Sequence, residues 1–595
     1  MDCSNVTEYF NIGLVNYKNK EYHKAFPMFL LAASKQNAMS QFYLGRMFEN
    51  GQGTLQDIKQ AHFYYLQSGN EGCGMAQHYL GQLNRHGCSG MPKDYSQAVN
   101  WFTREFDKSK SCGYLPGHSY YLSGQIYEEG GFGIEKSYDM ALYWYHKADE
   151  NRYAGAAFSI GLIYRKGKGV KQNYKQAIDW FLKAASNKDY AEKAYYNLAV
   201  IFIAGGNGIE KNFRQALDWL MKSVDRGSTH GTLAIGKIFR DGGFGVDKNH
   251  KKALDWFLEA AKTKSLTAYY NIGLIYRSGG YGVDISYPNS LYWTMKGARI
   301  GHLDSQYGMG LLYTFRTDEK QDFRQAFSWF QSAANNKHSH SQFYVGFFYE
   351  KGYGVDKSYE NAMSWYKKSA DNGQFSAYSS IGLLYHKGLG VAQDHGKALE
   401  MYRKVINMTG GHLDYGSAFH GIGLLYQEGM IFPQSHETAM HYFLMAAELN
   451  SAEACNSIGN IYNSGDGVII DHKNAFKWYS KCTKLVEENF DFCDEGLFNL
   501  GLMYFHGLGT HVSFEMALVY LNKSVKQGND KAQTYIDRVH RQHAQEAQGY
   551  QLLLDMIYSF GEEASGNKEN VDILMNHSDG VIEHGQKELK QNSTG

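Results

Sequence analysis

Two stretches of the sequence decide the fold, one built around a glycine and one around a tryptophan. They read Gly161-Leu162-Ile163-Tyr164, followed by Gly167-Lys168-Gly169-Val170, and then Ala177-Ile178-Asp179-Trp180-Phe181-Leu182-Lys183-Ala184-Ala185. Apolar residues recur in both at spacings of three and four, the pattern of a helix with one buried stripe. We therefore predict two short helices, A around Gly161 and B around Trp180. Glycines just past the end of helix A favour the left-handed conformation that closes a helix.

The pattern recurs along the chain, so the central glycine of helix A is used here as the pivot of each unit. Successive pivots are separated by 32 to 43 residues, and a period of this size is typical of stacked helical repeats. The fourteen pivots are Gly13, Gly45, Gly81, Gly124, Gly161, Ala199, Gly236, Gly273, Gly310, Gly346, Gly382, Gly423, Gly459 and Gly501.

Glycine and tryptophan both have a packing interpretation. Glycine inside a helix costs about 1 kcal/mol relative to alanine, so its recurrence predicts that a neighbouring helix passes too close for a Cβ. All nine tryptophans occupy one position of helix B, which predicts that they are core residues. They are Trp101, Trp144, Trp180, Trp219, Trp256, Trp293, Trp329, Trp365 and Trp478.

The motif from Gly161 to Ala185 resembles the Sel-1-like repeat family, a relative of the tetratricopeptide repeats. The resemblance covers residues 7–528 and implies an all-α fold, an α/α superhelical solenoid of about fourteen helix-pair repeats. We expect residues 529–560 to form a C-terminal capping helix and residues 561–595 to be a disordered tail. Members of this family act as adaptors that assemble protein complexes, so the resemblance also implies a partner-binding role.

Three long intervals between pivots place extra residues between helix B and the next helix A. They fall at Asp107 to Gly117, Met408 to Tyr415, and Val486 to Asp494. Insertions on one edge of a solenoid are often binding loops. Tolerated length variation on a surface edge is the alternative, and we favour it here.

Composition excludes several classes of function. The chain has 60 Lys and Arg against 60 Asp and Glu, so no net charge favours nucleic acid or an anionic membrane surface. No apolar run is long enough to span a bilayer, and the start lacks a secretory signal. The seven cysteines are odd in number and irregularly spaced, which suits a reducing compartment. We predict a cytoplasmic protein without membrane insertion.

The sequence contains few candidates for a catalytic or metal-binding site. Cys73, His78, His86 and Cys88 form the best candidate for a zinc site, but a helix across them would spread the ligands too far apart for one ion. Ser364-x-x-Lys367 matches a β-lactamase-type nucleophile, yet both residues occupy ordinary helix B positions. His338 and His340 near Ser341, and His540 with His543, are the closest histidine pairs, and no carboxylate partner is expected for either.

We therefore predict no catalytic, cofactor or metal site and assign no partner-binding residue. The expected function is a non-enzymatic scaffold or adaptor that holds proteins or peptides along a concave surface lined by helix A. The alternatives are a small-ligand-binding or hydrolase-like repeat protein and an adaptor of endoplasmic-reticulum-associated degradation. Four loop aromatics at equal positions, Phe132, Phe244, Tyr281 and Tyr353, form a second candidate surface. Packing of these rings against the neighbouring loop is the interpretation that we favour.

Overall fold

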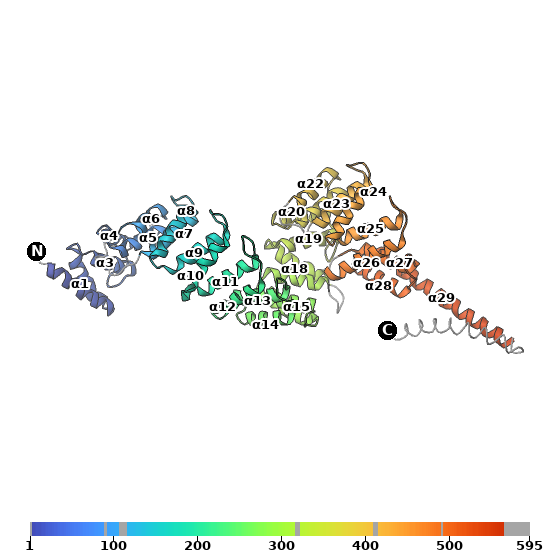
Figure 1. Cartoon of the computed structure of the whole chain (residues 1–595), viewed down its shortest axis with the longest axis horizontal. Coiled ribbons are helices and arrows are strands. Elements are labelled where there is room, and N and C mark those ends of the chain that lie inside the picture. The colour runs from blue at the N-terminus through green and yellow to red at the C-terminus, as the bar shows by residue number, and fades with distance from the viewer. Residues whose placement is uncertain are drawn as a thin grey trace. The chain divides into compact units, whose positions relative to one another are not determined.

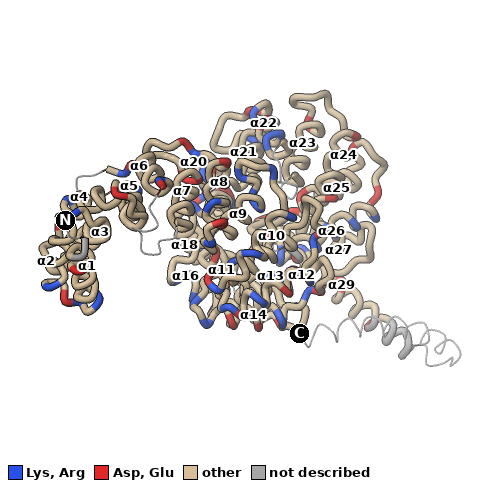
Figure 2. The backbone as a smooth tube through the Cα atoms, turned by 60° about the vertical axis from the view of Figure 1, so that its left-hand side comes forward, with Lys and Arg blue, Asp and Glu red and all other residues tan. Residues whose placement is uncertain are grey.

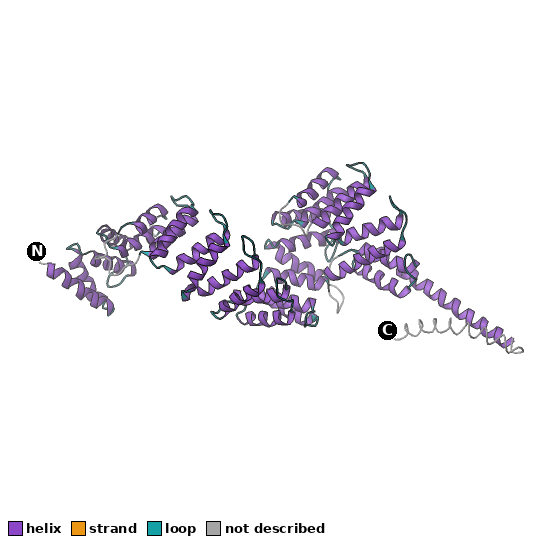
Figure 3. Cartoon of the chain, in the orientation of Figure 1, coloured by secondary structure: helices purple, strands orange, loops and turns teal. Residues whose placement is uncertain are grey.

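The computed structural model contains helices joined by short turns (Figure 1, Figure 3). It describes residues 3–87, 92–105, 116–315, 322–407, 415–489 and 492–563. These residues form 29 helices and no β-strand. Helices α1 to α28 follow one another as fourteen pairs, and within each unit successive pairs pack on one another. The predicted all-α solenoid of helix pairs is confirmed.

The chain divides into two compact units, which are described separately. Unit 1 is Met1–Gly297 and unit 2 is Ala298–Gly595. The helices of unit 1 are α1 (Cys3–Lys18), α2 (Tyr22–Ala33), α3 (Ala38–Asn50), α4 (Ile58–Asn70), α5 (Gly74–His86), α6 (Tyr95–Thr103), α7 (Gly117–Glu129), α8 (Tyr138–Glu150), α9 (Ala154–Lys166), α10 (Tyr174–Ala185), α11 (Lys188–Ala204), α12 (Phe213–Val224), α13 (Thr229–Asp241), α14 (His250–Lys262), α15 (Leu266–Ser278) and α16 (Tyr287–Ala298), whose last residue opens unit 2.

The remaining helices belong to unit 2. They are α17 (Leu303–Thr314), α18 (Phe323–Asn335), α19 (Ser339–Lys351), α20 (Tyr359–Asp371), α21 (Ser376–Lys387), α22 (His395–Ile406), α23 (Tyr415–Glu428), α24 (His436–Glu448), α25 (Ala452–Ser464), α26 (His472–Asn489), α27 (Asp494–His506), α28 (Phe514–Lys526) and α29 (Asp530–Glu563).

The pivot glycine of each helix A packs directly under a side chain from helix B of the same pair. A Cβ built on Gly161 would lie 2.8 Å from the Phe181 ring, and one on Gly382 would lie 2.6 Å from the Tyr402 ring. At the pivot that is alanine, Ala199, the facing residue is the smaller Leu220, and both are fully buried in one cluster. The predicted close approach is confirmed, and the ring that causes it lies on the partner helix of the same repeat.

The tryptophans lie at the edge of the core. All nine are only partly buried, whereas the residue that follows each tryptophan, such as Phe181 after Trp180, is buried. Seven of the indoles pack against a buried cluster from outside, as Trp365 packs against the cluster of Phe330 and Phe348. The prediction that the tryptophans are core residues is therefore wrong: helix B points its next residue inward, toward the glycine.

Capping side chains fix the ends of the helices. Asn173 and Asn212 accept hydrogen bonds from the backbone N–H groups of Gln176 and Gln215 at 3.1 and 3.0 Å, as N-caps that satisfy otherwise unpaired donors. Gly167 ends α9 in the left-handed region, with φ at +66°, as the turn pattern predicts. Short loops of this kind set the angle between the two helices of a pair.

The two ends of the chain differ from the interior. The first pair, α1 and α2, lacks the glycine turn, and Lys20 takes positive φ between its helices. At the other end, the first turns of α29 pack on α28 through Ala532, Ile536 and Val539. Helix α29 runs from 530 to 563 rather than ending at 560, and residues 564–595 of the predicted tail lie outside the described residues. Figure 2 shows acidic and basic residues interspersed along the tube of the chain.

Candidate functional site

Three aromatic residues of unit 1 occupy the same place in the loop between helices A and B. Phe132, Phe244 and Tyr281 have positive φ of 48°, 47° and 50°, which is unusual for residues with a side chain. Each lies in a tight turn that begins at the preceding glycine and is closed by a backbone hydrogen bond. In the turn of Phe244, for example, the N–H of Gly243 donates to the Val246 carbonyl at 2.7 Å. The turn holds each ring on the outside of the loop.

These loops also contact the start of helix B in the preceding repeat. The N–H groups of Tyr95, Phe213 and His250 donate to the carbonyls of Phe132, Phe244 and Tyr281 at 2.8, 3.2 and 3.1 Å. The paired rings lie 5.0 to 5.1 Å apart. We predicted packing against the neighbouring loop; the three rings pack against the preceding repeat, on the first residue of its helix B.

Packing nevertheless leaves the three rings largely exposed to solvent. Phe132, Phe244 and Tyr281 keep 55%, 54% and 58% of their surface accessible. A lysine covers each ring, with Nζ at 5.4, 4.5 and 4.8 Å from the ring centre; the lysines are Lys93, Lys211 and Lys248. Cation–π contact of this kind holds a ring in place while one of its faces stays accessible. We name Phe132, Phe244 and Tyr281 the loop ridge of unit 1.

Tyr353 does not belong to this ridge, although its sequence predicts that it does. Only 8% of the residue is exposed, and its φ is not positive. Its ring stacks on Phe323 at 4.5 Å and lies 5.6 Å from Phe492. Its hydroxyl donates to the carbonyl of Gln527, 174 residues further along the chain. The prediction of four equivalent loop aromatics is wrong at this position.

Phe492 comes from one of the three inserted segments and explains why Tyr353 is buried. Its ring lies 5.0 Å from Phe315 and 5.1 Å from Phe347, so it joins the aromatic cluster of the earlier repeats. The next residue, Cys493, donates its N–H to the Gln527 side chain at 3.0 Å. We call these contacts of Phe492, Tyr353 and Gln527 the closure of unit 2. The preferred interpretation of this insertion, tolerated length variation at the surface, is therefore wrong: Phe492 makes internal contacts. Of the other two insertions, residues 107–115 and 408–414 lie outside the described residues.

The face formed by helices A is linked by polar contacts between successive helices. His78 lies 2.9 Å from the Ser119 hydroxyl, His420 lies 2.9 Å from the Ser457 hydroxyl, and the Asn499 amide donates to Asn456 at 2.9 Å. Burial lowers the pKa of both His78 and His420 to about 4, so both rings are neutral at physiological pH. These polar side chains therefore bond to one another between successive helices.

One triad-like arrangement was missed by the sequence, because its carboxylate comes from the preceding repeat. His338 places Nδ1 at 2.8 Å from the Ser341 hydroxyl and Nε2 at 3.2 Å from the Asp304 carboxylate. This hydrogen bond lowers the pKa of Asp304. The expectation that this histidine pair lacks a carboxylate is wrong.

The same atoms show that this arrangement is an N-cap. His338 Nδ1 also accepts the Ser341 backbone N–H at 3.2 Å, which starts α19, and His302 caps α17 through Ser305 in the same way. Ser341 is fully buried, so its hydroxyl has no access to a substrate. The geometry serves helix capping and lacks the exposed nucleophile of a hydrolase.

The other candidate chemistry also falls into structural roles. Ser364 and Lys367 lie exposed on α20, and Tyr366 between them is buried with its hydroxyl on Glu350 at 2.8 Å. Cys73 and His86 stand at opposite ends of α5, and Cys88 lies outside the described residues. Within the described ranges, no three His, Cys, Asp or Glu side chains are grouped as metal ligands.

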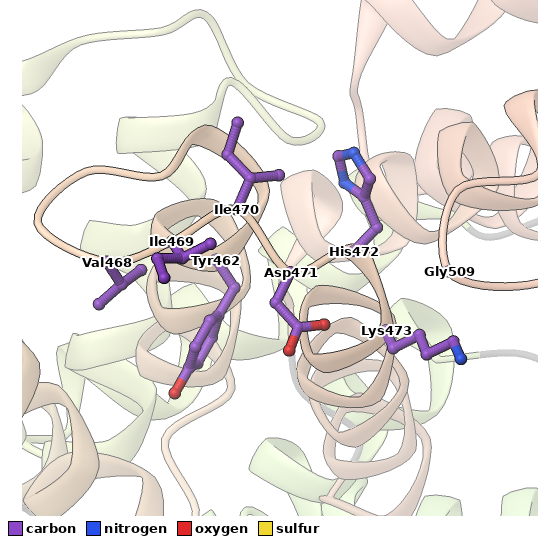
Figure 4. Close-up of a pocket in the computed structure, with 8 residues that line it drawn as sticks. All are labelled: Tyr462, Val468, Ile469, Ile470, Asp471, His472, Lys473 and Gly509. Carbon is purple, nitrogen blue, oxygen red and sulfur yellow. The ribbon is translucent and has the colours of Figure 1, made fainter.

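An open cavity of about 670 Å³ lies beside the turn between α25 and α26 (Figure 4). Figure 4 shows Ile470 and His472 directed to one side and the Asp471 carboxylate to the other. Asp471 accepts the Asn474 N–H at 3.0 Å as the N-cap of α26, and His472 contacts Asn463 at 3.0 Å. Asp471 and His472 are thus engaged in hydrogen bonds that shape the turn and the start of α26.

The repeats themselves identify the family. The sequence model of the Sel1 repeat matches thirteen segments, which together cover more than half of the chain. The chain belongs to the Sel1 repeat family. The matched segments are 38–73, 74–104, 117–148, 154–189, 192–228, 233–262, 266–302, 303–338, 339–374, 376–408, 418–451, 452–482 and 494–529. The pair α1–α2 precedes the first matched segment.

Two solved structures of similar proteins carry the same repeats. One is c5321, a protective antigen of uropathogenic Escherichia coli displaying an SLR fold, with 26% identity over 73% of this chain and 90% of that chain and a TM-score of 0.41. The other is a Sel1 repeat protein from Oxalobacter formigenes, with 28% identity over 43% of this chain and all of that chain and a TM-score of 0.36. None of the curated proteins compared with this Sel1 repeat chain matches it in sequence. No helix among the described residues has the length and apolar character needed to cross a bilayer.

Proposed function

We propose that this Sel1 repeat protein is a non-enzymatic cytoplasmic scaffold that holds partner proteins or peptides, and that the loop ridge of unit 1 is a contact surface for them. The observation that carries the proposal is the repeated exposure of Phe132, Phe244 and Tyr281, each more than half accessible. Aromatic side chains are enriched at protein interfaces and dominate their binding energy.

The construction of the ridge supports this role. Each ring is fixed by its turn and by a lysine, so binding requires little ordering of the side chain. Phe244 and Tyr281 lie in consecutive repeats, which offers two anchors to a single partner. Each weak contact then raises the local concentration for the next one.

The chain itself offers a substitution that separates binding from folding. Asn207 occupies the same loop position in another repeat, with φ of 52° and the same bridge between Gly206 and Ile209. Asparagine tolerates the left-handed region well. A variant with Phe132→Asn, Phe244→Asn and Tyr281→Asn should therefore keep its turns and lose its anchors.

The test is quantitative affinity purification of the wild type and this variant, with circular dichroism of both. The expected result is a defined set of partner proteins that the variant loses at unchanged helicity and thermal midpoint. An identical partner set would contradict the role of the ridge, and turnover of a chromogenic β-lactam by the purified protein would favour the hydrolase-like alternative.

A further inference from the structure

One helix pair of unit 2 departs from the rule that an aromatic ring stands directly before the residue that packs on the pivot. In twelve of the fourteen pairs this residue is tryptophan or tyrosine. The two exceptions are Met28 in the first pair and Met401 on α22. Met401 is therefore the exception inside the array, with aromatic residues at this position in the pairs on both sides.

Met401 takes the place of an indole in its packing. It contacts the cluster of the preceding repeat, which includes Tyr366 and Ile381, as Trp365 contacts the cluster one repeat earlier. A methionine chain is narrower than a fused ring system. We attribute to this difference the cavity that Met401 lines together with side chains of α20, α21 and α22.

A cavity of about 310 Å³ is found at this place, within the range of ligand-binding pockets. Its apolar floor combines two tyrosine rings with aliphatic side chains, while charged side chains from α20 and α22 form its rim. The lining residues are Lys367, Ala370, Asp371, Tyr378, Ile381, Tyr385, Lys397, Glu400, Met401 and Lys404.

The rim indicates the charge of the ligand. Lys404 Nζ lies 4.8 Å from the centre of the Tyr378 ring, and Lys397 Nζ lies 5.5 Å from that of Tyr385. The rim holds Lys367, Lys397 and Lys404 with Asp371 and Glu400. Lys397 also forms an ion pair with Asp394 at 3.2 Å, so Lys367 and Lys404 are the lysines that meet acidic groups of a ligand. A ring that enters the cavity therefore meets cations at its edge, which favour acidic groups beside it.

We infer that this cavity, the Met401 pocket, binds an aromatic side chain, with tryptophan the best fit, from an acidic segment of a partner protein. The partner supplies the ring that the other repeats carry in their own sequence. The inference rests on the proposed scaffold function and extends it from the loops of unit 1 to the helices of unit 2.

The test measures fluorescence anisotropy with the full chain and a fluorescein-labelled peptide, Asp-Glu-Trp-Glu-Asp. Met401→Trp fills the pocket with the residue that the repeat normally uses, and Met401→Leu is the matched control that leaves it open. We expect the wild type and Met401→Leu to bind, and Met401→Trp to bind at least about tenfold more weakly, because the ring of the peptide can no longer be buried.

Two further comparisons separate the ring from the charge. Replacing the peptide's tryptophan by alanine should weaken binding by at least about tenfold, and Lys367→Gln with Lys404→Gln should weaken it and flatten its salt dependence. No binding by the wild type at millimolar peptide, equal binding of both peptides, or full binding by Met401→Trp would each overturn the inference.

These outcomes are distinguishable from failure of the loop ridge. The asparagine variant of unit 1 leaves α20 to α22 unchanged, so it should bind the peptide as the wild type does. If that variant loses partners and the wild type does not bind the peptide, the inference about the Met401 pocket is refuted and the role of the ridge is supported. If the variant keeps its partners and the wild type binds the peptide, the inference about the pocket is supported and the role of the ridge is refuted.

Discussion

The loop after α13 and the loop after α19 have nearly the same sequence and different surroundings. The first reads Gly243-Phe244-Gly245-Val246-Asp247-Lys248 and the second Gly352-Tyr353-Gly354-Val355-Asp356-Lys357. Phe244 is 54% exposed and contacts Phe213 and Lys211 of the preceding repeat, while Tyr353 is 8% exposed and contacts Phe492 and Gln527. The first loop also has one glycine more, Gly242, and its turn gives Phe244 a positive φ that Tyr353 lacks. The length of the loop and the contacts made by Phe492 and Gln527 together decide whether the ring is exposed or buried.

The largest expected difference between the two loops comes from removing their rings. Tyr353→Ala should lower the free energy of unfolding by about 3–5 kcal/mol, as for a buried aromatic residue, because it empties the closure of unit 2. Phe244→Ala, its matched control, should cost under about 1 kcal/mol. Urea unfolding followed by circular dichroism measures both, and equal losses would show that the closure contributes nothing to stability.

The glycines that follow the two rings should differ next. A Cβ on Gly354 would lie 2.4 Å from the Phe323 backbone, whereas the nearest atom to one on Gly245 is 3.8 Å away, on Arg214. Both positions have positive φ, so alanine adds strain of about 1–2 kcal/mol to each. Gly354→Ala should add roughly 1–3 kcal/mol more from the clash. A thermal midpoint lowered equally by both substitutions would contradict the described packing.

Acid should affect the two units alike, since each holds on its helix A face a histidine whose pKa is strongly lowered by burial. Burial lowers the pKa of His78 in unit 1 and His420 in unit 2 to about 4. The unfolded chain binds protons near pH 6.5, so the stability that each ring supports is complete above that pH and is lost as the pH falls toward 4. The loss should be roughly 2–3 kcal/mol for each histidine.

His420→Gln should flatten this pH dependence in unit 2 and leave that of unit 1 unchanged. Hydrogen exchange of α23 and α5 between pH 4 and 7, corrected for intrinsic rates, resolves the two units. A variant as acid-sensitive as the wild type in α23 would show that another group titrates there.

The smallest difference concerns one hydroxyl group. Tyr353→Phe removes the hydrogen bond to the Gln527 carbonyl and should cost about 1 kcal/mol, while Tyr281→Phe in the exposed loop should be neutral. Faster exchange of amides around residues 527–530 in Tyr353→Phe alone is the expected signature. If Tyr281→Phe costs as much, the hydroxyl of the ridge has a partner of its own.

The period of the pivot glycines determined the helix pairs, their number and the close approach between them, because a missing Cβ and a facing ring are both encoded within one repeat. The left-handed glycine turns and the asparagine N-caps were predictable for the same reason: their partners lie within a few residues. The partial burial of the tryptophans was not predictable. Trp180 and Phe181 are adjacent on helix B, and either could face the glycine as far as the sequence pattern is concerned. Only the packing of the two helices determines that Phe181 does.

Contacts between repeats were decided by the tertiary structure alone. The Asp304 carboxylate reaches His338 from the preceding repeat, and Phe492 reaches Tyr353 across more than one hundred residues. The Met401 pocket has the same origin. A methionine in place of tryptophan leaves a cavity only because α20 and α22 lie on either side of it. Sequence periodicity specifies the two helices of each repeat and the contacts between them. The stacking of repeats brings distant side chains together, and the pocket that we infer at Met401 arises from that stacking.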